Sequence, residues 1–374
     1  MAKEINHQEM YDSLVSLTEE SKTFFYSDQI KDEKIYRIFN YRIASYSEFL
    51  LPYALECRGV TFEIDGNGKM IKLVSLPMAK FFNIYENPIT ENLDFSKVKK
   101  FMVKSDGSLI STYIHHGSLY LKSKGSFSSD QAIDAMKWLS SNNSPLNDVL
   151  LEYTTKGYTC NLEWVSPNNR IVLKYPKPKL HLLNIRNNTT GEYLDLTSSN
   201  FDIIRDYVIK YEIPDDPQEF VEKIPNMKGI EGYVVEFEDG YEPKFVKIKT
   251  NEYFALHRIV DSVNSPKALF MCVLEEATDD VRSMFHNDKE IIERIDNMER
   301  YVESLYNDII GKVDTFVKEN MELDFKDFAI KCKSELVPEY FSLAMNQRRG
   351  KEVSYKEFLI KNYRKYVDDK YSDI

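Results

Sequence analysis

Turn residues and helical periodicity divide this chain into two parts that follow different folding rules. Eleven of the 13 glycines and 11 of the 13 prolines lie before residue 244. Glycine and proline form the turns between short strands, and they interrupt helices. Beyond about residue 255, apolar residues from Ile291 to Ile309 recur at intervals of three and four, which places them on one helix face. The sequence therefore predicts an α+β domain over residues 1–254 and an all-helical domain over residues 255–374.

The first part alternates short apolar, β-branched and aromatic runs with turns, a pattern typical of antiparallel sheets with a few flanking helices. We expect strands at residues 36–39, 59–64, 71–76, 101–103, 109–114, 119–121, 160–165, 171–175, 180–185 and 232–237, and a helix at 129–140. In the second part, further helices are expected at residues 324–333, 338–347 and 355–367.

Composition narrows the class of protein. With 374 residues, 43% of them apolar, the chain can bury a sizeable core. No stretch approaches the roughly 20 apolar residues that a bilayer demands, so we expect no membrane association and a cytoplasmic location. The net charge of −11 argues against indiscriminate coating of nucleic acid but leaves room for a local basic groove. The four scattered cysteines are expected to be reduced, structural thiols.

Lys104 begins the run Lys-Ser-Asp-Gly-Ser, where a predicted strand breaks into a turn. A lysine amine has an unperturbed pKa of about 10.4 and needs help to act as a nucleophile at neutral pH. Lys247 and Lys249 alternate on a predicted strand, so both ammonium groups share one face. Nearby cations disfavour the ammonium form of a nucleophilic lysine and also neutralise phosphate oxygens. This combination suits nucleotidyl transfer, in which positioning and charge stabilisation supply most of the catalysis.

Each residue alone also has an ordinary structural interpretation. Lys104 by itself is more often a solvated turn lysine, and Lys247 and Lys249 are by default the solvent face of a strand. Glu163 between Leu162 and Trp164 is equally consistent with a carboxylate at the edge of the core. The ordered set is more specific than any member, and it favours the functional interpretation.

The order of these residues carries a resemblance. Lys104-Ser-Asp106-Gly, Glu163, Glu231-Gly232 and Lys247-Ile-Lys249 resemble motifs of the covalent nucleotidyltransferases, which comprise RNA ligases, DNA ligases and messenger-RNA capping enzymes. Further strings narrow the likeness: Leu55-Glu-Cys-Arg58-Gly, Met78-Ala-Lys80-Phe-Phe-Asn and Leu121-Lys-Ser-Lys-Gly-Ser. Together they resemble the phage RNA ligase 1 family of tRNA-repair enzymes, from residue 24 to about residue 285.

The resemblance implies an ATP-dependent RNA ligase. Lys104 would attack the α-phosphorus of ATP, form lysyl-AMP and pass AMP to an RNA 5′-phosphate, which a 3′-hydroxyl then attacks. The expected cofactors are ATP and Mg²⁺, with Mn²⁺ as an alternative. The expected substrate is cleaved tRNA, with a polynucleotide kinase/phosphatase preparing its ends. The protein is expected to be a monomer, and its location is the host cytoplasm if the gene belongs to a phage.

The resemblance also carries over individual residues. It implies catalytic roles for Lys104, Asp106, Lys122, Lys124 and Glu231. It implies cofactor contacts for Tyr41, Arg58, Lys80, Phe82, Glu163, Lys247, Lys249 and Tyr253, and a metal-binding role for Asp279. Asp106 and Glu231 would steer the lysine or coordinate magnesium, and Phe82 would pack beside the base. A helix-capping role is equally consistent with Asp279, because Thr-Asp-Asp is a common start of a helix.

Two other function classes stay open at this point. A catalytically silent RNA-binding protein on the same scaffold would not require Lys104 in particular. A DNA ligase or capping enzyme usually carries a β-barrel after the last motif, and the helical periodicity here argues against one. His115 and His116 lie next to a predicted turn at Gly117, and we expect both to be exposed and neither to be catalytic.

Overall fold

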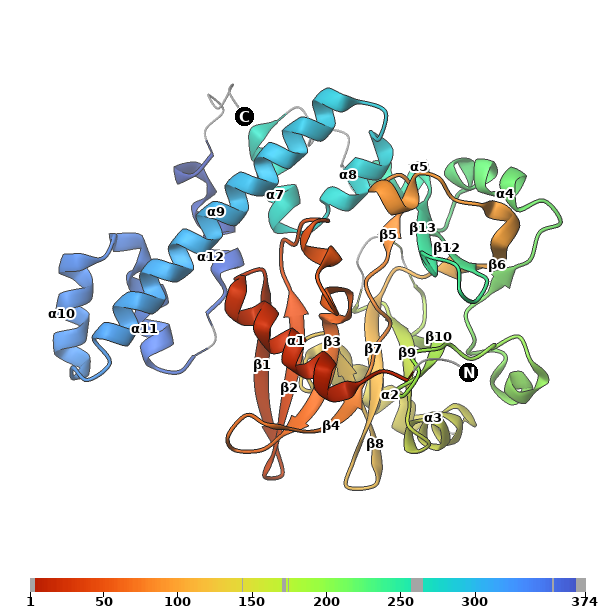
Figure 1. The fold of residues 1–374 in the computed structure, drawn as a ribbon, viewed down its shortest axis with the longest axis horizontal. Coiled ribbons are helices and arrows are strands. Elements are labelled where there is room, and N and C mark those ends of the chain that lie inside the picture. The colour runs from red at the N-terminus through yellow and green to blue at the C-terminus, as the bar shows by residue number, and fades with distance from the viewer. Residues whose placement is uncertain are drawn as a thin grey trace. The chain divides into compact units, whose positions relative to one another are not determined.

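The structure is a computed structural model that describes residues 4–142, 144–169, 173, 175–256, 265–351 and 353–367. The chain forms two compact units, Met1–Arg258 and Ile259–Ile374, where the sequence predicted a boundary at 254/255. The first unit is α+β and the second is helical, as the sequence predicted (Figure 1). Within the described residues, no helix has the length and apolar character needed to cross a membrane.

Three sheets build the first unit. The first has the strand order β1-β2-β3-β4, the second β10-β9-β7-β8 and the third β11-β6-β12-β13-β5. All pairs are antiparallel except β13 with β5. The strands are β1 (Phe24–Lys31), β2 (Lys34–Tyr41), β3 (Arg58–Ile64), β4 (Met70–Ser75), β5 (Phe82–Asn83), β6 (Val98–Lys104), β7 (Ser108–His115), β8 (Ser118–Ser123), β9 (Tyr158–Val165), β10 (Lys179–Asn187), β11 (Tyr211–Glu212), β12 (Gly232–Phe237) and β13 (Phe245–Lys249).

Helices cover the sheets of this unit. They are α1 (His7–Glu20), α2 (Asp130–Ser141), α3 (Leu146–Thr155), α4 (Pro217–Lys223) and α5 (Asn251–Leu256). The sequence predicted α2 but not α1, which begins where the side chain of Asn6 accepts the backbone N–H groups of Gln8 and Glu9. Nine of the ten predicted strands are present. The tenth, at 171–175, includes residues 171, 172 and 174, which lie outside the described part of the chain.

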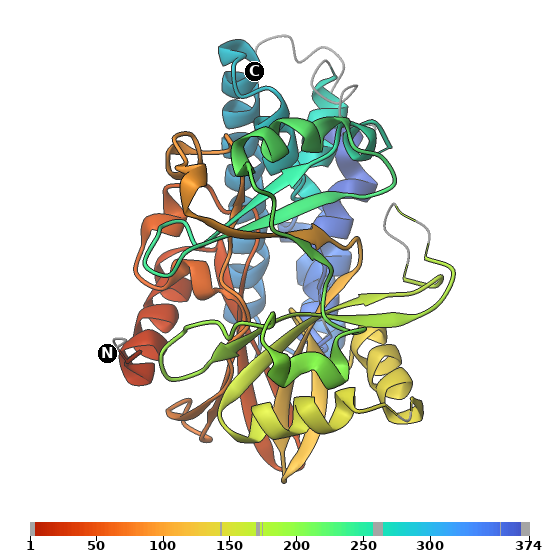
Figure 2. The ribbon, with the colours of Figure 1, turned by 90° about the vertical axis from the view of Figure 1, so that its right-hand side faces the viewer.

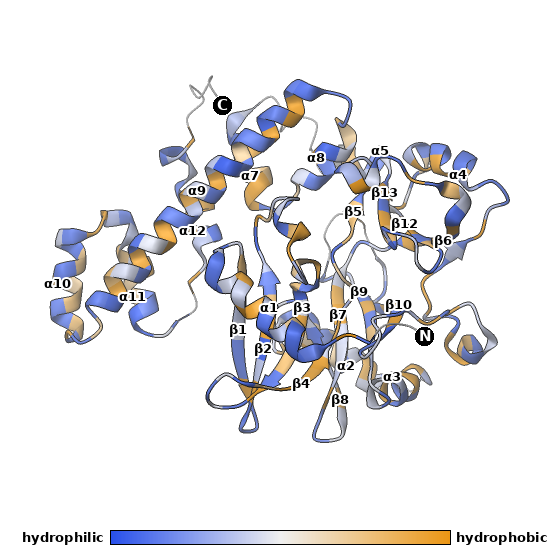
Figure 3. Cartoon of the chain, viewed as in Figure 1, coloured by the Kyte–Doolittle hydropathy of each residue, from blue (hydrophilic) through white to orange (hydrophobic). Residues whose placement is uncertain are grey.

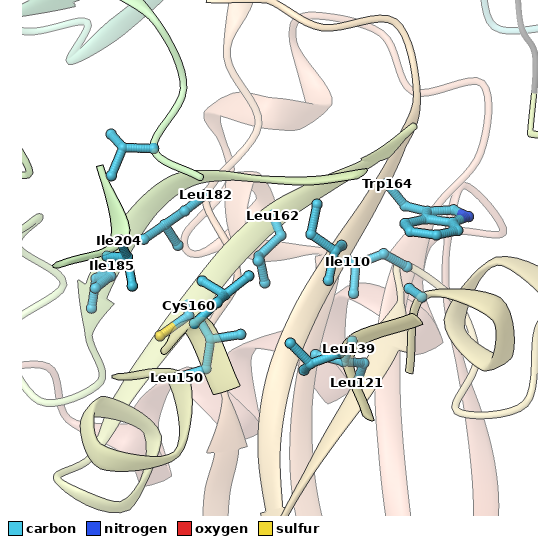
Figure 4. Packing of buried hydrophobic residues seen from close by; sticks show 14 of the residues in the cluster. Ile110, Leu121, Leu139, Leu150, Cys160, Leu162, Trp164, Leu182, Ile185 and Ile204 are labelled. Atoms are coloured by element: carbon cyan, nitrogen blue, oxygen red, sulfur yellow. The ribbon is translucent and has the colours of Figure 1, made fainter. Parts of the chain in front are cut away.

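A buried apolar cluster joins the second sheet to α2 and α3, which pack on one of its faces (Figures 2 and 4). Ile110 and Leu162 come from the sheet, whereas Leu139 and Leu150 come from the two helices, and all four are at most 1% exposed. Burial of each such side chain stabilises the fold by about 1.5–3 kcal/mol. The second sheet is therefore a rigid support for the residues that its strands carry.

The first sheet and the second sheet each contain one tight hairpin. Asp32 and Glu33 join β1 to β2 with φ of 45° and 66°, and His116 and Gly117 join β7 to β8 with φ of 47° and 76°. Two consecutive residues with positive φ are typical of hairpin turns whose twist matches that of the strands. Both turns lie at the same end of the unit (Figure 1). His115 is 3% exposed, so the prediction of an exposed side chain is wrong for this residue.

The second unit consists of helices around one long, amphipathic member. The helices are α7 (Pro266–Leu274), α8 (Thr278–Met284), α9 (Lys289–Glu319), α10 (Phe325–Glu335), α11 (Phe341–Arg348) and α12 (Tyr355–Asn362). Ile295, Met298, Val302 and Ile309 of α9 are buried, as the periodicity predicted. Hydrophobic and hydrophilic bands alternate along this helix (Figure 3). The buried stripe explains why α7 and α11 pack on α9.

Candidate active site

Three neighbouring strand ends bring charged side chains together in the third sheet. The central strand β12 pairs on one side with β6 and on the other with β13, so that Gly232 lies opposite both Lys104 and Lys249. Residues directly opposite each other in antiparallel strands point to the same face of the sheet. Gly232 has a φ of 156°, and a Cβ there would lie 2.0 Å from the carbonyl oxygen of Ile248. Only glycine therefore permits this close pairing.

Glu231 joins the two lysines through one oxygen atom. Its Oε1 lies 2.8 Å from Nζ of Lys104 and 3.2 Å from Nζ of Lys249. Burial of Glu231, which is 2% exposed, would raise the pKa of its carboxyl group, but the two ammonium groups outweigh burial and lower it. The carboxylate is therefore ionised at neutral pH and fixes the position of the Lys104 amine.

A cavity of about 260 Å³ lies beside this cluster. Its wall includes Lys104, Lys249 and three further predicted site residues: Arg58, Glu163 and Lys247. Lys247 and Lys249 alternate on β13, which explains why both reach the same space. Cationic and carboxylate groups on an otherwise largely apolar wall are typical of a pocket for a charged small molecule.

Glu163, on β9 of the second sheet, faces Lys104 from another wall of the cavity. Its Oε1 accepts the backbone N–H of Gly107 at 3.1 Å, which ties β9 to the turn after Lys104. Burial is the main cause that raises the pKa of Glu163 to about 7, and Glu231 adds to it, whereas Lys104 and Arg58 oppose it. Glu163 can therefore change its protonation state near neutral pH.

Asp106 holds the turn that follows Lys104. Its carboxylate accepts the backbone N–H of Leu173 at 2.5 Å and the hydroxyl of Tyr253 at 3.1 Å, and its own backbone N–H donates to the hydroxyl of Tyr175 at 2.9 Å. Asp106 is 2% exposed and Tyr253 is 3% exposed. Neither is part of the cavity wall, so the geometry indicates that both position the turn carrying Lys104.

Tyr41 lies at the centre of a second group of basic side chains. Nζ of Lys124 is 4.5 Å from the centre of its ring, and Nζ of Lys80 is 5.8 Å from it. Both distances fit cation–π attraction between an ammonium group and the Tyr41 ring. None of these three residues is among those that line the cavity.

Phe82 does not line the cavity. It is 3% exposed and packs edge-on against Tyr46 and Phe49. Its neighbour Phe81 lines the cavity instead, because successive side chains of an extended segment point to opposite sides. The run Phe-Phe was visible in the sequence, but nothing in it indicated which ring faces the pocket.

Lys122 is fully buried away from the cavity. Its Nζ donates to the carbonyl oxygens of Gly59 at 2.8 Å and of Ser123 at 3.0 Å. Burial lowers the pKa of this amine to about 7. Gly59 has a φ of 95°, and a Cβ there would lie 2.7 Å from the carbonyl oxygen of Lys124. Lys122 therefore joins β8 to the start of β3, directly beside Arg58, instead of contacting the contents of the cavity.

Asp279 belongs to the second unit, in the first turn of α8. Its Oδ1 accepts the backbone N–H of Asp280 at 3.0 Å, and Ala277 occupies the capping position. An acidic side chain in the first turn of a helix is stabilised by the helix dipole. A metal-binding role for Asp279 stays a prediction.

One pair beside Lys104 had no signal in the sequence. The hydroxyl of Ser105 lies 2.8 Å from Nδ1 of His181 on β10. Burial and the charges of Lys179 and Lys210 lower the pKa of His181 to about 4, so the ring is neutral at pH 7. The two residues are 76 positions apart and meet only because β10 pairs with β9, where His181 lies opposite Glu163.

Mg²⁺ requires hard oxygen ligands, and the described site offers them. The carboxyl groups of Glu231 and Glu163 both interact with the charge of Lys104, and the charge of Glu231 also acts on Glu163. Mg²⁺ is commonly held by one or two carboxylates together with phosphate oxygens and water. Glu163 in the cavity wall and Glu231 beside Lys104 therefore fit a magnesium–nucleotide complex.

Comparison with known families and proteins gives a consistent result. A family model described as RNA ligase matches residues 56–254, more than half of the chain. A second model, described as the C-terminal domain of T4 RNA ligase 1, matches residues 260–371.

Individual relatives agree with these matches. RNA ligase 1 of bacteriophage TS2126 is 28% identical over 331 residues, which span 82% of this chain and 78% of that protein. A protein of Thermovibrio ammonificans with the description of an RNA ligase is 29% identical over 258 residues, 67% of this chain and 66% of that one. An archaeal ATP-dependent RNA ligase structure is similar in fold, with a TM-score of 0.50, 11% identity and 82% of each chain covered.

Proposed function

Because this chain belongs to the ATP-dependent RNA ligase family of T4 RNA ligase 1, we propose that Lys104 is its nucleophile and that cleaved tRNA is its substrate. One observation carries the first part of the proposal. Lys104 lies at the wall of a cavity, with its amine held by a buried carboxylate that a second lysine shares. Such preorganisation lowers the cost of bringing an amine to a fixed phosphorus atom.

In the first step the Nζ of Lys104 attacks the α-phosphorus of ATP. A P–N bond forms, the bond to the β-phosphate oxygen breaks, pyrophosphate leaves and the amine loses its proton. Glu231 orients the amine through its 2.8 Å contact. Lys247 and Lys249 stabilise the negative charge that develops on the α-phosphate oxygens.

The remaining contacts divide between the two ends of the nucleotide. Glu163 accepts hydrogen bonds from the ribose hydroxyls, for which an ionised carboxylate is well suited. Phe81 packs beside the base in place of Phe82. Arg58 and Lys80 neutralise the β- and γ-phosphates, and the planar guanidinium of Arg58 suits contact with two oxygens at once.

Magnesium, held by Glu231 or Glu163 together with phosphate oxygens, would supply charge neutralisation at the reacting phosphate. Asp106 and Tyr253 position Lys104 for the reaction, because they hold the turn that carries it. Lys122 also acts through the backbone, since it holds Gly59 next to Arg58. Lys124 lies next to Tyr41 and can meet the RNA 5′-phosphate.

In the later steps AMP passes to an RNA 5′-phosphate, and a 3′-hydroxyl then attacks that activated phosphate and displaces AMP. The substrate must therefore carry a 5′-phosphate and a 3′-hydroxyl. Ribonucleases that leave other ends would require a kinase and a phosphatase to act first. A net charge of −11 supports recognition of one structured end, where few phosphates are engaged.

The proposal is tested with ATP labelled at the α-phosphate. The protein, with bound AMP removed and Mg²⁺ added, is denatured after incubation and the label attached to the chain is measured. We expect label on the wild type and on Lys99→Ala, a matched variant of the same strand, but none on Lys104→Ala. Absence of label from folded, AMP-free wild type would reject the mechanism and favour a protein that only binds RNA.

The substrate is tested separately. A tRNA cut in its anticodon loop is offered with 5′-phosphate and 3′-hydroxyl ends, beside an unstructured RNA of equal length with the same ends. We expect the cut tRNA to be sealed faster. Equal rates would reject the tRNA-repair role and leave the adenylation mechanism intact.

A further inference from the structure

Two hairpin tips from different sheets meet at a cluster of metal-ligating side chains. Asp32 lies in the turn between β1 and β2, while His115 and His116 end β7 and begin the turn to β8. Oδ2 of Asp32 lies 2.8 Å from Nε2 of His115. These residues are not among those that line the nucleotide cavity. The cluster is therefore separate from the residues that line the cavity.

The donor atoms are close enough to share one ion. Asp32, His115 and His116 each offer one ligand atom, and the three atoms lie within 4.8 Å of one another. His115 is 3% exposed, whereas Asp32 and His116 are exposed. One rigid ligand at the base and two accessible ligands above it leave a path for an ion to enter from solvent.

Tyr36 fixes the buried ligand. The hydroxyl of Tyr36, which is 1% exposed, lies 2.6 Å from Nδ1 of His115. If Nδ1 donates its proton to this hydroxyl, Nε2 keeps its lone pair and points toward Asp32. A histidine ligand held at its far nitrogen by a hydrogen-bond partner is typical of metal sites, where the partner sets the tautomer and the ring orientation.

We propose that Asp32, His115 and His116 bind a divalent transition-metal ion, with Zn²⁺ as the best match. Two imidazoles and one carboxylate are a common ligand set for zinc, and water completes the coordination. Mg²⁺ and Ca²⁺ prefer oxygen ligands alone, so the ion that serves nucleotide chemistry would not compete well here. The bound ion would join the first sheet to the second at their hairpin tips.

One neighbouring charge opposes the ion. Lys31 precedes Asp32, and its Nζ lies 3.1 Å from the hydroxyl of Tyr113 and 3.2 Å from the centre of the Tyr120 ring. These contacts hold the ammonium in place beside the cluster. We therefore expect binding that is reversible by chelators, not a permanently held ion.

The test uses the full chain without a histidine tag and with all metal removed. Zn²⁺ is titrated calorimetrically, and Co²⁺, which absorbs visible light according to its ligands, serves as a spectroscopic probe. We expect one ion per chain and a higher Tm with Zn²⁺. His116→Ala and Asp32→Asn, both at exposed positions, should each weaken binding by at least about tenfold, and Tyr36→Phe by about 10- to 100-fold.

His286→Ala is the matched control, because His286 is exposed and belongs to the second unit. The four cysteines are all buried, which removes them as competing ligands. Unchanged affinity in His116→Ala, or no binding and no change in Tm at millimolar Zn²⁺, would overturn the proposal. Attachment of AMP to Lys104 should be the same in all these variants, so the outcome is independent of the proposed ligase mechanism.

Discussion

Lys104 and Lys122 lie near the ends of β6 and β8, and both belong to short lysine-containing strings, yet their surroundings differ in kind. Lys104 is 22% exposed, faces a cavity and contacts the carboxylate of Glu231. Lys122 is fully buried and contacts two carbonyl oxygens. A carboxylate positions an amine without preventing its release for reaction. An amine bonded to two backbone carbonyls stabilises the fold. Substitutions of the two lysines should therefore have different effects on activity and on stability.

The largest effect is expected for the carboxylate that holds Lys104. Glu231→Gln removes the buried carboxylate charge that Lys104 and Lys249 share, and removal of one partner from a buried ion pair costs about 3–5 kcal/mol. If that cost falls on the transition state, the rate of lysyl-AMP formation drops by about 100-fold or more. Single-turnover labelling with ATP labelled at the α-phosphate measures the rate of lysyl-AMP formation.

Glu236→Gln is the matched control, because Glu236 is also buried on β12 and pairs with Lys100 at 3.2 Å and Lys244 at 3.4 Å. It should lower the Tm while leaving the labelling rate near that of the wild type. If both variants lose label equally, the loss reflects stability of the third sheet, and Lys104 has no special dependence on Glu231.

A smaller effect is expected for Lys122→Met. This change keeps the length of the side chain but removes the donor to Gly59, so Arg58 loses its fixed position. We expect the chain to become fully labelled at a rate about tenfold lower, which corresponds to about 1.4 kcal/mol. A folded Lys122→Met that takes up no label would show that Lys122 is required for adenylation as Lys104 is, and would contradict a purely structural role.

The same variant should change how stability depends on pH. The pKa of Lys122 is lowered to about 7 in the folded protein, against about 10.5 in the unfolded chain. Between these values the unfolded chain binds the proton more readily, so the free energy of unfolding rises with pH, by up to about 1.4 kcal/mol per unit. Urea unfolding at pH 7.5 and 9 should show this gain in the wild type. An equal gain in Lys122→Met would show that other groups cause it.

The smallest effect concerns Glu163. Its pKa of about 7 means that it is increasingly ionised as the pH rises from 6 to 8. A hydrogen bond to a charged acceptor is stronger than one to a neutral acceptor by about 1 kcal/mol, so ATP affinity should rise by about threefold over this range. Glu163→Gln should flatten the profile. A wild-type affinity that does not change with pH would contradict contact between Glu163 and the nucleotide.

Most of the fold could be predicted because the spacing of apolar residues and of turn residues is visible in the sequence. Short apolar and β-branched runs between turns indicated strands such as β7 and β12, and the three- and four-residue spacing indicated α9. The strands β5 and β11 have two residues each, too few for any pattern. The N-terminal helix α1 was missed although Met10, Leu14 and Leu17 have helical spacing.

The site was predictable only in its chemistry. The order of Lys104, Glu163 and Glu231 indicated which side chains belong together. It did not indicate that Lys122 is buried, because that depends on the packing of β8 against Gly59, 63 residues earlier. Nor did it indicate that His115 is buried, since Tyr36 and Asp32 reach it from another sheet.

Gly232 has a consequence for how widely the two lysines are separated. Adjacent strands in a sheet lie about 4.8 Å apart, so the backbones of β6 and β13, with β12 between them, are about 10 Å apart. On the face that Lys104 and Lys249 share, the central position bears only a hydrogen atom. Two long side chains can therefore lean inward from both neighbours and meet at one carboxylate oxygen. The missing side chain, as much as the lysines themselves, determines the distance between the two charges.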